Sequence, residues 1–156
     1  MPLIFCTAPA PDPMPAWVVV AIVLGFFVVF PLFWCAVVWL VGVRWRSLAA
    51  EFSSPWPPPP TARLFHGQSA VLGWTRYNRV LTIAVTPDAI HLRPIAIFAV
   101  GHPALSIPWE RFGVPREAGL FKGTGLLSAP VRRANGREMD LRLPRPVWAA
   151  SPLAAH

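Results

Sequence analysis

The chain contains 156 residues, of which 54% are apolar and only 13% charged, and its formal net charge is +7 at pH 7. The charged share is about half that of a typical soluble domain, which disfavours a wholly soluble protein. The basic residues occur singly or in one pair, without a zinc-finger spacing or an aromatic RNA-binding motif, so nucleic acid is not an expected partner. Two cysteines, one of them inside an apolar run, exclude a disulfide framework.

Residues 17–43 form a run without a single charged side chain. As a helix this run would be about 40 Å long, against a hydrocarbon core of about 30 Å. The sequence therefore predicts a transmembrane helix over residues 17–43, preceded by a short extracytoplasmic tail, residues 1–16. Trp17 and Trp45 bracket the run, and amphipathic indole rings favour the headgroup level.

Arg44 and Arg46 bear on whether this helix is retained or is a cleaved signal peptide. A signal peptide carries a positive N-terminal region and an apolar stretch of about 7–15 residues. Here the tail lacks Lys and Arg, and all 14 basic residues lie at or after Arg44. We expect a retained anchor in a bacterial inner or plasma membrane, with the N-terminus outside and the remainder in the cytoplasm.

Residues 44–61 combine the basic stop signal with a proline-rich segment. Pro55 and the run from Pro57 to Pro60 favour an extended polyproline II conformation. The segment is predicted to be a semi-rigid stalk, and a proline-rich ligand for an aromatic groove is the alternative.

Residues 62–146 have the pattern of a small antiparallel β-domain of about six strands, beginning with a strand over residues 68–74. A four-residue turn starting at Thr86 would place Val85 opposite Ile90 and Ile83 opposite Leu92 on one apolar face. The other face would carry the polar side chains of this hairpin and one alanine: Thr82, Ala84, His91 and Arg93.

Asn135-Gly136 marks a second hairpin. A three-residue loop over residues 134–136, with Gly136 in the left-handed conformation, gives the apolar pairing. It pairs Val131 with Met139, Ala129 with Leu141, and Leu127 with Leu143, and it sets Arg132 opposite Glu138. Between the hairpins we expect strands over residues 95–100 and 105–112, with Pro108 interrupting the second. Residues 117–125 are predicted to be a loop, and residues 147–156 a flexible tail.

Two of these segments, VTPDAIHLRP and IPWERF, resemble parts of bacterial pleckstrin-homology-like and GRAM-like domains. VTPDAIHLRP is similar to their V-T-x-x-x-I/L-x-L/I-R hairpin, and IPWERF to the I-P-W/Y-x-x-I strand that follows it. The resemblance implies a curled, barrel-like sheet, often fused to a membrane helix. Pleckstrin-homology domains end in a capping helix, for which the two prolines of RPVWAASPLAAH leave little room. The basic cluster of a phosphoinositide site is missing between the first two strands, so headgroup binding does not carry over.

Motifs for catalysis are absent from the sequence: the histidines lack metal-ligand spacing, and no nucleophile elbow or phosphate-binding loop occurs. We therefore expect no metal, no cofactor and no enzymatic activity. Thr82, His91 and Arg93 form the candidate binding surface. The expected function is a membrane-anchored, non-catalytic binding or assembly module with a membrane or cytoplasmic protein partner. The alternatives are a membrane-tethered subunit of an enzyme complex and a domain that binds anionic lipid headgroups.

Overall fold

The computed structural model describes residues 14–117 and 125–155. The predicted N-terminal tail up to residue 13 and most of the predicted loop 117–125 lie outside these ranges. The chain divides into two compact units, Met1–Cys35 and Ala36–His156, which are described separately.

Helix α1 (Ala16–Val41) accounts for most of the described part of the first unit and continues into the second. Its most apolar 18-residue window has a mean hydropathy of 2.8 and no buried residue, so the helix is long and apolar enough to cross a membrane. The predicted long apolar helix is therefore confirmed. Within the first unit, Phe26 stacks on Phe30 one turn later, with ring centroids 5.2 Å apart.

Helix α2 (Val43–Phe52) replaces the first half of the predicted stalk, so that prediction was wrong for these residues. The apolar side chains of α2 recur with helical spacing and are buried in the core of the β-domain: Trp45, Leu48, Ala49 and Phe52. The segment after α2 also belongs to the domain. Ser53 bridges Leu105, and the Ser54 amide donates to the Ala104 carbonyl at 3.0 Å.

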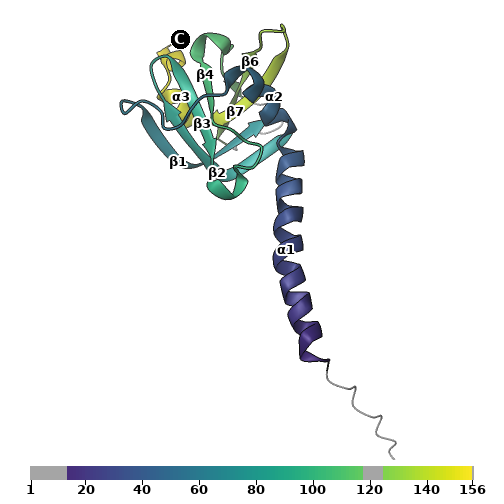
Figure 1. Cartoon of the computed structure of the whole chain (residues 1–156). Coiled ribbons are helices and arrows are strands. Elements are labelled where there is room, and N and C mark those ends of the chain that lie inside the picture. The colour runs from purple at the N-terminus through teal and green to yellow at the C-terminus, as the bar shows by residue number, and fades with distance from the viewer. Residues whose placement is uncertain (1–13, 118–124, 156) are drawn as a thin grey trace, which may run out of the picture. The chain divides into compact units, whose positions relative to one another are not determined.

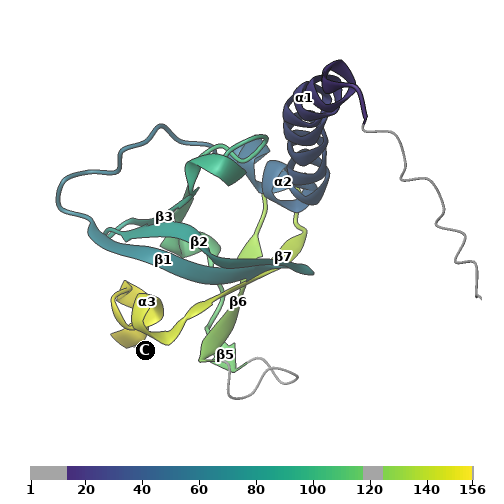
Figure 2. The ribbon, with the colours of Figure 1, turned by 90° about the horizontal axis from the view of Figure 1, so that it is seen from below.

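Seven antiparallel strands form one curled sheet in the order β4-β3-β2-β1-β7-β6-β5. Figure 2 shows β5 and β6 running across the direction of β1 to β3. The sheet curls far enough for the segment after β4 to reach β6, where Phe112 bridges Val131. The strands are β1 (Arg63–Leu72), β2 (Thr75–Val85), β3 (Ala89–Pro94), β4 (Leu105–Pro108), β5 (Arg116–Glu117), β6 (Leu126–Arg132) and β7 (Glu138–Pro144).

Both predicted hairpins are confirmed in register. In the first, Val85 pairs with Ile90 and Ile83 with Leu92. In the second, the three apolar pairs and the pairing of Arg132 with Glu138 occur as predicted, and Gly136 has φ +74°. The Gly136 amide donates to the Arg133 carbonyl at 3.0 Å, which closes the turn. The strands of these hairpins, β2, β3, β6 and β7, are labelled in Figure 1. Their apolar residues supply much of the core: Leu81, Ile83, Ile90, Leu92, Val131, Leu141 and Leu143.

The strand predicted over residues 95–100 is wrong. The segment is a turn containing a 3-10 helix, Ala96–Phe98, and its apolar side chains are partly exposed. Pro94, which has no amide hydrogen to continue a ladder, ends β3. The same cause ends β4 at Pro108, after which Trp109–Arg111 form a second 3-10 turn.

The prediction of a flexible tail over residues 147–156 is also wrong, because helix α3 (Arg145–Ala149) and a 3-10 helix (Pro152–Ala155) occupy most of these residues. The Trp148 indole is buried against Trp109 and Phe112 and donates to the Leu127 carbonyl at 3.1 Å. Proline in the first turn of a helix is tolerated because the amides there have no intrahelical partner, so the proline in this turn does not prevent α3.

Candidate functional site

A cavity of about 350 Å³ beside the start of α2 gathers side chains from three separate parts of the second unit. Helix α2, the β1–β2 turn and the β6–β7 loop with the start of β7 all contribute to it. We call it the arginine pocket, and its lining is Val43, Arg44, Ser47, Trp74, Arg133, Arg137, Glu138 and Met139. Three of these residues are arginines, so the cavity has a cationic character.

Arg44 and Trp74 form one wall of the arginine pocket. The Arg44 guanidinium lies over the Trp74 ring, 4.3 Å from its centroid. Trp74 is 79% exposed because it occupies a two-residue turn, in which Gly73 has φ +60°. An indole this exposed, beside a cation three residues after the end of α1, is typical of a side chain that meets a membrane interface.

Arg133 also lines the arginine pocket, and its hydrogen bonds connect α2 to the β6–β7 loop. Its guanidinium donates to the Ser47 hydroxyl at 3.0 Å and to the Ser47 carbonyl at 2.6 Å. The Glu51 carboxylate lies 3.9 Å from Arg133 Nε and accepts a hydrogen bond from the Ala134 amide at 2.8 Å. The charge of Arg133 is therefore used within the fold.

Arg44 and Arg137 differ from Arg133 in this respect. Within residues 14–117 and 125–155, neither forms an ion pair with a carboxylate, and Glu138 is paired with Arg132 instead. Arginine guanidinium groups bind phosphate oxygens through paired hydrogen bonds. The arrangement is therefore suited to holding a phosphate-bearing anion.

The four residues predicted at the membrane interface have different environments. Trp17 is exposed on α1, and Arg44 lines the arginine pocket. Arg46 folds back over Trp39, 4.1 Å from the ring centroid, and donates to the Trp39 carbonyl. Trp45 is only 2% exposed, and its indole donates to the Pro103 carbonyl at 2.7 Å. Its prediction as a headgroup-level residue was wrong, because the ring is part of the domain core.

The predicted binding surface of Thr82, His91 and Arg93 does lie on one face, since Thr82 pairs with Arg93 in the sheet. Each side chain contacts another part of the chain. Thr82 Oγ1 lies 3.4 Å from His66 Nδ1, His91 Nε2 lies 3.5 Å from Thr86 Oγ1, and Arg93 lies over Trp56. Burial lowers the pKa of His91 below its ordinary value. This face is therefore less available to a partner than the arginine pocket.

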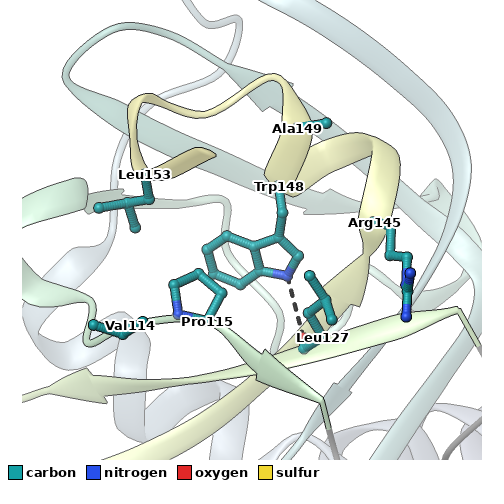
Figure 3. Close-up of a pocket in the computed structure, with 7 residues that line it drawn as sticks. All are labelled: Val114, Pro115, Leu127, Arg145, Trp148, Ala149 and Leu153. Atoms are coloured by element: carbon teal, nitrogen blue, oxygen red, sulfur yellow. Dashed lines mark hydrogen bonds between the residues drawn. The ribbon is translucent and has the colours of Figure 1, made fainter. Parts of the chain in front are cut away.

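A second cavity, of about 400 Å³, lies between α3 and the segment leading into β5 (Figure 3). Its lining is largely apolar, with the Trp148 indole facing Pro115 and Leu127. Arg145, at its edge, is ion-paired with Glu117. The second cavity therefore lacks the unpaired cations of the arginine pocket.

Of these pocket residues, Arg44 was predicted from the sequence, whereas Trp74, Arg133 and Arg137 were not. The signal for Trp74 was its place after Gly73 in a tight turn, and the signal for both arginines was the Asn-Gly loop that they flank. In the described portion of the chain, no group of three or more His, Cys, Asp or Glu side chains could hold a metal ion. Comparisons with protein-family models, curated proteins and solved structures found no match to this chain.

Proposed function

We propose that the chain is a single-pass membrane protein whose β-domain is a non-catalytic binding or assembly module at the cytoplasmic face of a bacterial inner or plasma membrane. The observation that carries the proposal is helix α1, a continuous apolar helix of 26 residues. Trp17 and the half-exposed Trp39 are 22 positions apart in it, about 33 Å at 1.5 Å per residue, close to the hydrocarbon thickness of about 30 Å.

The domain type that we propose is pleckstrin-homology-like. Support comes from the curled antiparallel sheet and from α3, which follows the last strand at the position of the capping helix of that family. The orientation rests on Arg44 and Arg46, which follow the apolar run directly and favour the cytoplasmic side.

Vesicle flotation of the full chain tests the anchor. Wild-type protein is expected to float with vesicles and to resist extraction at alkaline pH. The double variant Val28→Asp, Val29→Asp should lose both properties, because each central carboxylate costs about 3 kcal/mol in the bilayer. The matched control is Val28→Ala, Val29→Ala, which should behave as wild type. Full extraction of the wild-type chain would contradict a spanning helix.

Binding of an anionic lipid headgroup is a second candidate function, favoured by Arg44 and Arg137 beside the exposed Trp74. Two arginines near an anionic leaflet gain about 2 kcal/mol of attraction together. The test is quenching of tryptophan fluorescence by brominated phosphatidylglycerol against brominated phosphatidylcholine, with Trp74→Phe isolating the Trp74 signal.

Selective quenching by phosphatidylglycerol is expected for the wild type and should be lost in Arg44→Gln, Arg137→Gln. The control pair, Arg63→Gln, Arg116→Gln, changes two exposed arginines outside the arginine pocket and should leave the selectivity intact. Equal quenching by both lipids in the wild type would exclude headgroup selection. Loss of the selectivity on adding inorganic phosphate would identify a soluble phosphate as the competing ligand.

The rival function, a membrane-tethered subunit of an enzyme complex, makes a different prediction. In that case the chain should copurify with a catalytic subunit whose turnover falls when the chain is removed.

A further inference from the structure

The β3–β4 connection carries a cluster of exposed apolar side chains. Ile95, Ile97 and Val100 are 41%, 57% and 40% exposed within six residues. The sequence from Pro94 to Trp109 contains no Asp, Glu, Lys or Arg. Exposed apolar side chains gathered in one short uncharged turn favour contact with an apolar surface.

The turn has a fixed shape. The Ile95 amide donates to the Val80 carbonyl of β2 at 2.8 Å, the Phe98 amide donates to the Ile95 carbonyl at 2.9 Å, and the His102 amide donates to the Ala99 carbonyl at 3.0 Å. These bonds close the 3-10 turn and hold it on the sheet. Its apolar side chains are therefore presented to the outside by the fold itself.

The turn is also held against the last residues of α1 and the first of α2, all within the second unit. A Cβ atom on Gly101 would lie 3.0 Å from the Trp39 ring, and one on Gly42 would lie 2.6 Å from the His102 ring. The Trp45 indole donates to the Pro103 carbonyl, and His102 Nε2 lies 3.2 Å from the Tyr77 hydroxyl. The turn is therefore held in a fixed position beside Trp39.

A bilayer places Trp39 at the boundary between hydrocarbon and headgroups. A helix of 26 residues is about 39 Å long and exceeds the hydrocarbon core of about 30 Å, so its ends reach the headgroup region. The segment that contacts Trp39 lies at the same depth. An apolar, uncharged turn is suited to that boundary, where partial burial of its side chains is favourable.

We infer that residues 95–100 form a second membrane contact, in which Ile95, Ile97 and Val100 insert into the lipid interface beside the end of α1. This inference rests on the proposed membrane anchor. The consequence is that the β-domain is held close to the bilayer surface and does not stand away from it on a stalk.

Depth-dependent quenching of the full-length chain in vesicles tests this inference. An environment-sensitive dye is attached to single cysteines at Ile97, at Asp88 and at Ile22, after Cys6→Ser and Cys35→Ala. Asp88 is the matched control, because it is exposed and lies at the opposite end of β3, about 20 Å from Ile95 along the strand. Ile22 lies in the first half of α1 and reports on the anchor alone.

The dye at Ile97 is expected to have a blue-shifted emission and to be quenched by lipids with a nitroxide near the headgroup, whereas the dye at Asp88 is not. Quenching at Ile22 without quenching at Ile97 would overturn the inference and leave the anchor intact. Absence of quenching at Ile22 would overturn the anchor and this inference together. Near-UV circular dichroism of each labelled variant verifies that the β-domain is folded, and if the Ile97 label unfolds it, the same measurement is made with the label at Val100.

Discussion

Replacing Leu48 by alanine is expected to destabilise the β-domain by about 3–4 kcal/mol. Leu48 lies on α2 and is fully buried in the core. Removing three carbons loses about 2.4 kcal/mol at about 0.8 kcal/mol per buried CH2 group. The cavity that remains adds about 1 kcal/mol, because the surrounding side chains relax only partly. For a domain of roughly 100 residues, this corresponds to a decrease in Tm of 10 °C or more.

The free energy of unfolding is measured by denaturant titration of the full chain in a mild detergent, followed by near-UV circular dichroism. Val43→Ala is the matched control on the same helix, since Val43 is about half exposed and its truncation should change the free energy by about 0.5 kcal/mol or less. If Leu48→Ala were as mild as Val43→Ala, α2 would not be part of the core. The stalk interpretation would then be correct.

Three further changes test other parts of the fold. Gly136→Ala should cost about 1–2 kcal/mol because φ is +74° there, and Gly136→Asn should cost less, which a urea titration of both variants measures. Arg133→Ala should lower the free energy of unfolding by about 2 kcal/mol through its lost hydrogen bonds to α2, whereas Arg132→Ala, at the exposed neighbouring residue, should lower it by about 0.5 kcal/mol or less. Equal effects would contradict the role of Arg133 in holding α2 to the β6–β7 loop. Burial lowers the pKa of His102 in the folded state, so its neutral imidazole contributes fully to stability above the unfolded pKa of 6.5. This contribution should be lost as the pH falls through and below that value, because the unfolded chain then binds a proton that the folded domain does not. His102→Gln should reduce the slope of Tm against pH on the acid side, and the slope that remains is attributed to His91. An unchanged slope would show that His102 is not buried as a neutral group.

The hairpins could be predicted because their determinants are local. Alternation from Ile83 to Leu92 defines one apolar face, and Asn135-Gly136 defines a loop with a known bulge. Helix α2 also carried a local signal, the spacing of Trp45, Leu48 and Phe52, but arginines before it and prolines after it favoured a stalk. A core helix differs from a stalk because other parts of the chain bury its apolar side chains. For α2, strands far along the chain do so.

The arginine pocket could be predicted only at Arg44, for a similar reason. Trp74 and Arg137 approach Arg44 because β1 pairs with β7 in the curled sheet. This strand pairing could not be predicted from the sequence. Trp45 was placed at the membrane interface because its position after the apolar run is typical of an interfacial tryptophan. Its hydrogen bond to the Pro103 carbonyl, 58 positions away, is a tertiary contact that periodicity cannot show.

The central claim, a retained anchor with its β-domain in the cytoplasm, is tested most directly by reporter fusions in a bacterial membrane. Reporters are placed after Ala10 and after His156. Alkaline phosphatase is active only outside the cytoplasm, and green fluorescent protein exported in unfolded form does not fluoresce. A retained anchor with a cytoplasmic β-domain should give an uncleaved chain that is fluorescent and phosphatase-inactive when fused at His156, and phosphatase-active when fused at Ala10. Phosphatase activity at His156, or cleavage near Ala49, would contradict it.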